Sequence, residues 1–244
     1  MPEREPTRRD HGIKLGHDET GDYIMPLHLN TSRSRWLVAG AVGAAAAAMY
    51  VGDKAPYPYP QHLLLDLPLP FLTSRSLDRI LQPQPGERIL EIGPGTGLQT
   101  LHVAPKLGPA GQLDIVDIQK EMLGHVMRQA RRKELVTISP SLSDARNLPF
   151  GDNLFDAVYL VTALGEIPEP ELVIAEAARV IKPSGRLVVG EFFDRHWIPF
   201  SRLRRMATES GFQIDDWSGP TLAYMARFRP IERDAPLAQS TFVQ

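Results

Sequence analysis

Residues 74–230 switch repeatedly between short apolar runs and segments in which apolar positions recur every three or four residues. Apolar runs that stop at glycine or acidic residues predict buried strands, whereas the longer spacing predicts amphipathic helices. The predicted helices lie near 74–82, 97–107, 119–133, 169–181 and 199–210, and the predicted strands near 88–92, 112–117, 135–139, 155–161, 186–191, 212–217 and 222–229. The pattern therefore predicts an α/β domain.

This alternation of strands and helices predicts a mostly parallel, doubly wound sheet with helices on both faces. The last two strands could close the sheet as an antiparallel hairpin. In open sheets of this kind, ligands bind at the carboxyl ends of the strands, near the point where the strand order reverses. Functional residues are therefore expected in the loops that follow the strands.

The most informative of these loops lies in residues 89–98, with the sequence ILEIGPGTGL. Its glycines, Gly93, Gly95 and Gly97, let the backbone turn tightly and let a ligand approach where a Cβ would collide. The helix predicted next would present its N-terminal amides to that ligand. Glu91 stands just before the turn, where a carboxylate repels phosphate but suits a cation or a ligand that carries hydroxyls.

Other glycine-rich turns fit this segment less well. A dinucleotide-binding fingerprint requires G-x-G-x-x-G or A, and counted from Gly93 its last position falls on Leu98. A phosphate-binding loop requires Gly-Lys-Ser/Thr, which does not follow here. A β-turn without a ligand remains the alternative on the evidence of the turn by itself.

The second predicted strand ends in an acid, Asp117, which lies 22 positions after Gly95. A carboxylate about 20 residues beyond a glycine-rich turn, at the tip of the next strand, can accept hydrogen bonds from ribose hydroxyls. Asp117 could also cap the helix that follows it. The two roles are compatible, and the spacing from the glycine turn favours ribose binding.

Four segments in this order resemble the motifs of class I S-adenosylmethionine (SAM)-dependent methyltransferases, especially small-molecule and quinone-ring methyltransferases. They are the E-x-G-x-G-x-G turn of 91–97, the acid at Asp117, the Asp144–Ala145 pair followed by LPF and FDAV, and the IKPSGRL turn of 181–187. In the last of these, a serine replaces one glycine of the usual L-K-P-G-G-x-L. The resemblance implies a Rossmann-like sheet of seven strands in the order 3-2-1-4-5-7-6.

The resemblance also implies SAM as cofactor, with S-adenosylhomocysteine as its product, and assigns roles to residues of this chain. Glu91 would face the methionine end of SAM, Asp117 the ribose and Asp144 the adenine amino group. Ile118 and Met122 would pack near the adenine ring. The implied cofactor-binding residues are Glu91, Gly93, Pro94, Gly95, Gly97, Asp117, Ile118, Met122, Asp144, Ala145 and Thr162.

Methyl transfer from SAM is an in-line displacement, so positioning of the acceptor can supply most of the catalysis. A general base is needed only if the acceptor must lose a proton. The candidate catalytic residues are Glu166 after the fourth predicted strand, His196 after the fifth, and Tyr57, which could reach the site from the N-terminal side. The histidines show no metal-ligand spacing and the chain has no cysteine, so no metal site is predicted.

Composition fits a globular domain of cytoplasmic location. The chain is 43% hydrophobic, and its net charge of −2 gives no basic footprint for nucleic acid. The absence of cysteine suits a reducing compartment. Residues 1–35 are polar and charged and are predicted to be a disordered tail. Residues 74–230 form the predicted methyltransferase domain, and 231–244 are a C-terminal tail.

Residues 36–73 form an apolar N-terminal extension. Residues 36–52 carry no charge over 17 positions, whereas 55–72 are rich in proline and leucine. The first stretch is at the short limit of a membrane span, and its alanines and glycines make it only weakly hydrophobic. The extension is therefore interpreted as a helical or extended lid, with peripheral membrane contact through 36–72 as the alternative.

These observations predict a SAM-dependent methyltransferase that acts on a small acceptor, hydrophobic or associated with lipid. Two alternatives remain open: a methyltransferase for a soluble metabolite or natural product, and a SAM-binding regulatory subunit without turnover. A nucleotide-dependent oxidoreductase is a more distant alternative. The sequence predicts neither the identity of the acceptor nor the oligomeric state.

Overall fold

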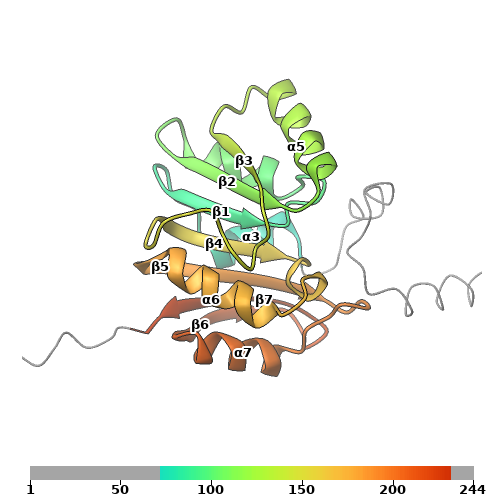
Figure 1. Cartoon of the computed structure of the whole chain (residues 1–244), viewed down its shortest axis with the longest axis vertical. Coiled ribbons are helices and arrows are strands. Elements are labelled where there is room, and N and C mark those ends of the chain that lie inside the picture. Colours follow the sequence, from blue (N-terminus) through green and yellow to red (C-terminus); the bar gives the residue numbers. More distant parts are fainter. Residues whose placement is uncertain (1–71, 232–244) are drawn as a thin grey trace, which may run out of the picture. The chain divides into compact units, whose positions relative to one another are not determined.

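In the computed structural model, which describes residues 72–231, seven strands form one sheet with helices on both faces (Figure 1). The strand order is β3-β2-β1-β4-β5-β7-β6, as predicted. The strands are β1 (Arg88–Ile92), β2 (Gln112–Asp117), β3 (Ile138–Leu142), β4 (Phe155–Val161), β5 (Ile181–Phe192), β6 (Phe212–Ser218) and β7 (Ala223–Pro230). β7 runs antiparallel to both of its neighbours, β5 and β6, while the other pairs are parallel.

Helices cover both faces of the sheet, because its central strands are apolar on both sides. The helices are α3 (Ser74–Leu81), α4 (Thr100–Val103), α5 (Lys120–Arg132), α6 (Pro170–Val180) and α7 (Phe200–Glu209), with 3₁₀ turns η2 (Ala104–Leu107) and η3 (Leu164–Glu166). One core contains buried residues of α6 and α7, such as Ile174 and Leu203. The other contains those of α3, η2 and α5, such as Leu77 and Val126. Figure 1 shows α6 and α7 together on one face.

Two element boundaries in the first half differ from the prediction. The third strand begins at Ile138 instead of 135, because Glu134 takes a left-handed backbone after α5 and leaves Leu135 in the connection. The helix expected over 97–107 is split into α4 and η2. Pro105 accounts for the split, because proline has no N–H to donate within a helix and its ring crowds the preceding turn.

The fifth strand begins earlier than expected. It starts at Ile181, which pairs with Phe155 of β4, and the pairing resumes at Arg186 after an irregularity. The 181–187 segment is therefore part of the β5 strand and contains a bulge, whereas the motif predicted a free turn before it. Pro183 and Gly185 lie within the irregular part, where proline and glycine commonly interrupt a ladder.

Two buried arginines hold α3 against the sheet. Arg186 of β5 donates to the carbonyl oxygens of Leu81 and Gln82, and Arg227 of β7 donates to that of Ile80 at 3.0 Å. The last carbonyls of a helix have no partner within the helix, and these guanidinium groups supply one. Arg186 also pairs with Glu87 at 2.7 Å. The helix that opens the described chain is thereby fixed to the sheet.

None of the helices in residues 72–231 is both long and apolar enough to cross a membrane. The stretch 36–52 lies outside the described residues, and so do Tyr57 and both predicted tails.

Candidate functional site

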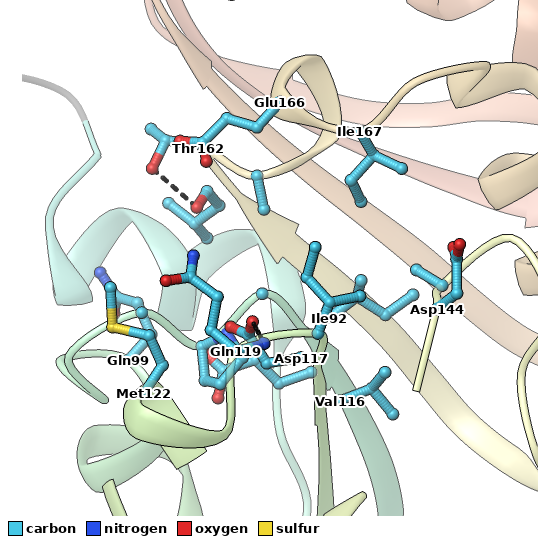
Figure 2. Close-up of a pocket in the computed structure, with 18 of the residues that line it drawn as sticks. Ile92, Gln99, Val116, Asp117, Gln119, Met122, Asp144, Thr162, Glu166 and Ile167 are labelled. Carbon is cyan, nitrogen blue, oxygen red and sulfur yellow. Dashed lines mark hydrogen bonds between the residues drawn. The ribbon is translucent and has the colours of Figure 1, made fainter. Parts of the chain in front are cut away.

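A cavity of about 330 Å³ opens where the carboxyl ends of β1, β2 and β4 meet (Figure 2). Small-molecule sites commonly occupy about 300–1,000 Å³ at such positions. Ten of the eleven residues predicted to bind a cofactor line this cavity, and Gly97 does not. One wall is the glycine turn, another is the start of α5, and the opposite wall is the connection that follows β4. The topology thus brings together residues that are far apart in the sequence.

The glycine turn requires glycine for reasons that differ along its length. Gly93 has φ +69°, and a Cβ there would lie 2.6 Å from the Cβ of Ala163 in the connection after β4. Gly97 has φ +87°, and a Cβ there would lie 3.0 Å from the side chain of Val126 on α5. Gly95 has φ +53° and lines the cavity. The turn is therefore packed against two neighbouring elements while its middle faces the cavity.

Glu91 is a buried carboxyl group at the bottom of the cavity, with a residue exposure of 3%. It accepts a hydrogen bond from the hydroxyl of Thr100, and its cross-strand neighbour on β4 is Tyr159. Burial raises the pKa of Glu91 to about 7; the nearby charge of Asp117 adds to this, and interactions with Thr100 and Tyr159 oppose it. The group is thus balanced between its two protonation states near neutral pH, and a cation placed beside it would favour the charged form.

Asp117 ends β2 and lines the same cavity as Glu91 (Figure 2). Its Oδ1 accepts from the backbone N–H of Gln119 at 2.8 Å. This is an Asx turn, because the N-cap position of α5 belongs to Gln119. Gln119 occupies the N-cap position, but its side chain makes no capping hydrogen bond, so the helix-cap role considered for Asp117 is not observed. Burial raises the pKa of Asp117 above its ordinary value, and the turn hydrogen bonds oppose that rise.

Asp144 lies after β3 at the far end of the cavity, where it is paired with Arg146. The Arg146 guanidinium donates to Asp144 at 2.7 Å, and the Arg146 backbone N–H donates at 2.9 Å. These hydrogen bonds hold the pKa of Asp144 below its ordinary value. Arg146 also reaches Glu169 at 3.4 Å, at the start of α6. The arginine is therefore shared between two carboxylates.

The wall after β4 carries Thr162, Glu166 and Ile167 (Figure 2). Thr162 has φ +55°, which is unusual for a β-branched residue, and its N–H donates to the carbonyl oxygen of Gly190 at 2.8 Å. Strained backbone of this kind is concentrated at functional sites. Of the two candidate catalytic residues within 72–231, Glu166, in η3, lines the cavity.

Of the other two catalytic candidates, His196 alone is among the residues that the structure describes. His196 lies in the connection after β5 and outside the cavity lining; its Nε2 accepts from Arg195 at 2.8 Å, and its backbone N–H donates to Asp194. Tyr57 lies outside the described residues. His196 is nevertheless close to the β4 connection, because a Cβ on Gly165 would lie 1.8 Å from its carbonyl oxygen.

Several lining residues were not among the predicted site residues. They are Leu72, Thr96, Leu98, Gln99, Gln119, Arg146, Ile167 and Pro168. Gln99 and Gln119 stand at the starts of α4 and α5, so their proximity follows from the sheet order and not from a local motif. Within residues 72–231, no three His, Cys, Asp or Glu side chains are grouped so that they could hold a metal ion.

Comparisons with known proteins agree with this geometry. Residues 90–189 match the family described as methyltransferase domain. The chain is 34% identical over 140 residues to the ubiquinone/menaquinone biosynthesis C-methyltransferase UbiE of Cupriavidus pinatubonensis, and 36% identical over the same length to that of Burkholderia mallei. Each match covers 57% of this chain and 56% of the relative, so the chain spans little more than half the length of these curated relatives.

Solved structures share the fold. A SAM-dependent methyltransferase from Aquifex aeolicus aligns with a TM-score of 0.64 at 17% identity, over 71% of this chain and 98% of that one. The [4+2]-cyclase SpnF aligns with a TM-score of 0.58 at 22% identity, over 65% of this chain and 80% of that one. The fold is that of class I SAM-dependent methyltransferases, and residues 90–189 are similar in sequence to a methyltransferase domain; SAM is the cofactor of that class.

Proposed function

We propose that this chain is an enzyme that transfers the methyl group of SAM to a small, apolar acceptor. One observation carries the proposal. A single cavity joins the glycine turn, Glu91 and Asp117 on one side to the β4 connection with Glu166 on the other. A methyl donor bound along the first wall would therefore meet an acceptor held by the second.

The cavity residues fit SAM by their chemistry. SAM is a cation with a ribose, and the buried Glu91 and the partly buried Asp117 offer carboxylates to the positive charge and to the hydroxyls. The apolar side chains of Ile118 and Met122 offer a surface for the adenine ring. When bound, SAM supplies a methyl group that its sulfonium already activates. The chain then has to orient that group and exclude water from it.

The charges around the cavity favour an acceptor without negative charge. Among the described residues, the lining contains the carboxyl groups of Glu91, Asp117, Asp144 and Glu166, whereas its single cationic residue in this part of the chain, Arg146, is already shared between two carboxylates. A carboxylate or phosphate on the acceptor would therefore meet repulsion with no cation to balance it. Leu72 and Ile167 line the same space with apolar surface, which suits a hydrophobic acceptor.

Glu166 is the residue that we propose as general base, if the acceptor must lose a proton. It lines the cavity from the β4 connection, where an acceptor would approach the methyl donor. The relatives are named ubiquinone/menaquinone biosynthesis C-methyltransferases. This supports a quinone-type ring as the acceptor and a ring carbon as the atom that is methylated. Loss of a ring proton after such a transfer requires an acceptor for the proton, and a carboxylate is suited to this step.

The first test is isothermal titration calorimetry of the full-length chain with SAM and, separately, with NADH. The proposal predicts binding of SAM and none of NADH, whereas the reverse would favour an oxidoreductase. Methyl release is then measured with a demethylated quinol, a set of soluble amines and carboxylates, and phospholipid as acceptors. Turnover on the quinol supports the proposal, and turnover on a soluble metabolite supports the first alternative. Binding of SAM without turnover on any of them supports a regulatory subunit.

We further propose that the chain is cytoplasmic and that its apolar segment 36–72 brings it to membrane surfaces, where hydrophobic acceptors reside. Co-sedimentation of the full-length chain with phospholipid vesicles tests this idea. Replacing Val38 and Val42 by glutamate should release the chain from the vesicles, because two charges in 36–52 oppose burial among acyl chains. Equal binding of both proteins would refute the membrane contact.

A further inference from the structure

A second buried carboxyl group, Glu191, lies at the end of β5 and outside the cavity lining. Its residue exposure is 2%, and its Oε1 has no hydrogen-bond partner within residues 72–231. A buried polar atom without a partner is costly, so its presence calls for a reason. None of the roles proposed above for the cavity uses this group.

The side chain of Glu191 lies where two connecting segments meet, the one between β5 and α7 and the one between β4 and α6. Its Oε2 accepts from the backbone N–H of Ile198 at 3.4 Å, in the segment between β5 and α7. The backbone carbonyl oxygen of Ile198 accepts from the hydroxyl of Tyr224 at 2.7 Å. Tyr224 is the cross-strand neighbour of Glu191 on β7. Both peptide groups of Ile198 are thus held by side chains that rise from adjacent strands.

The second connection is the one between β4 and α6, which carries Glu166. The backbone N–H of Gly165 in this connection favours the charged form of Glu191, as a nearby donor does. The two connections also meet directly, because Gly165 leaves no room for a side chain against the carbonyl of His196. A displacement of the Glu191 side chain would therefore shift both connections.

We propose that Glu191 is a positioning residue for the acceptor end of the cavity, joining the connection that carries Glu166 to the connection between β5 and α7. Glu191 acts through these segments and does not itself touch a substrate. This inference rests on the proposed function, which assigns Glu166 to the acceptor side. It predicts that the protonation state of Glu191 is reported by the segment from Asp194 to Ile198, whether or not SAM is bound.

The ionisable groups that face Glu191 come from each of the elements packed against it. They are Glu166 from η3, Asp194 from the β5–α7 connection and Tyr224 from β7. Burial is the largest influence and raises the pKa of Glu191 to about 8, and the negative charges of Asp194 and Glu166 act in the same direction. At neutral pH the group is therefore mostly uncharged, and it ionises in mildly alkaline solution.

Trp197 provides a spectroscopic reporter inside this segment. The chain has three tryptophans, and the other two, Trp36 and Trp217, can be replaced by phenylalanine so that Trp197 alone fluoresces. The full-length protein with these two substitutions is titrated from pH 6 to pH 10 and its emission is recorded. The proposal predicts a transition with a midpoint near pH 8, which Glu191→Gln abolishes. Glu209→Gln, at the exposed end of α7, is the matched control and should leave the transition in place.

A second substitution tests the coupling between the two connections. Glu166→Gln removes a negative charge that favours the protonated form of Glu191, so it should move the midpoint to lower pH. Glu191→Met serves if Glu191→Gln fails to fold, because an apolar chain of similar length suits a buried site. In addition, Glu191→Gln should leave the dissociation constant for SAM unchanged, since Glu191 lies outside the cavity lining.

The possible results are distinct. Persistence of the transition in Glu191→Gln and Glu191→Met, or an unchanged midpoint in Glu166→Gln, would overturn the proposal. Weakening of SAM binding by Glu191→Gln as severe as that caused by Asp117→Ala would also overturn it, because the residue would then act at the donor end. Failure of the parent protein to bind SAM would contradict the proposed function, whereas the Trp197 titration would still decide the role of Glu191.

Discussion

Two buried glutamates, Glu91 and Glu191, dominate the acid–base behaviour of the described domain at the scale of single residues. Their pKa values are raised from 4.5 to about 7 and about 8, in both cases mainly by burial. In the unfolded chain both groups ionise above about pH 4.5, while in the folded chain they keep their protons to higher pH. The folded state thus binds more protons than the unfolded state between these limits.

We therefore expect these two groups to lower the free energy of unfolding as pH rises from about 4.5 to about 8. Urea denaturation at a series of pH values measures this slope. Glu191→Gln should reduce the slope over the alkaline part of the range, and Glu209→Gln should not. A stability that rises with pH over this interval would contradict the assignment of neutral, buried carboxyls.

Asp117 is the residue whose role the sequence predicts most directly. Asp117→Ala should weaken SAM binding by about 1–3 kcal/mol, because charge-assisted hydrogen bonds to the ribose would be lost. Calorimetry with SAM measures the change, with Glu209→Ala as the surface control. An unchanged affinity would refute the ribose assignment, while far-UV circular dichroism would show whether the variant is folded.

At the scale of elements, the junction between the glycine turn and the β4 connection depends on the missing side chain of Gly93. Gly86 also has a positive φ, of +84°, but a Cβ added there would have no atom within 4 Å, so it is a matched control. Gly86→Ala should cost about 1–2 kcal/mol for the left-handed backbone. Gly93→Ala should cost about 1–3 kcal/mol more, because its Cβ would collide with Ala163.

Chemical denaturation of both variants measures this difference. Equal destabilisation of the two variants would show that the glycine turn and the β4 connection can move apart at no cost in stability. Gly95→Val addresses the middle of the same turn: it should abolish SAM binding if the backbone there approaches the cofactor.

The attachment of α3 to the sheet depends on Arg186, which is 7% exposed in its side chain and paired with Glu87. Arg186→Met should lower the free energy of unfolding by about 3–5 kcal/mol, because it leaves a mostly buried carboxylate and two helix carbonyls without their partner. Arg202→Met breaks an exposed pair with Glu171 and should cost no more than about 1 kcal/mol. Comparable losses in the two variants would contradict a special role for Arg186.

The sequence predicted the boundaries of some strands better than those of others. Strands such as β4, with its run FDAVYLV, were predicted with their boundaries because burial on both faces leaves a continuous apolar signal. β3 was misplaced because it is an edge strand with an alternating, partly exposed pattern, and Leu135 supplied an apolar start that belongs to the preceding turn. Propensity alone could not show that Ile181 already pairs with Phe155.

At the scale of the whole domain, the strand order followed from the resemblance and is confirmed. The cavity residues of the glycine turn and of the ends of β2 and β3 were largely predictable, because they lie in local motifs at strand ends. Leu72, Gln99 and Arg146 were not predicted, because they reach the cavity only through the packing of separate elements. His196 was chosen by its position after β5, but it lies outside the cavity lining, and its carbonyl oxygen lies against Gly165 of the β4 connection.

The fold itself does not decide the reaction, since a structure named as a [4+2]-cyclase shares it. The central claim is therefore that the cavity holds SAM against Asp117, and calorimetry of SAM with the full-length chain and with Asp117→Ala tests it most directly. We expect saturable binding at one site per chain, displaced by S-adenosylhomocysteine and weakened in the variant. No binding to the folded full-length chain, or equal binding to both proteins, would contradict the account.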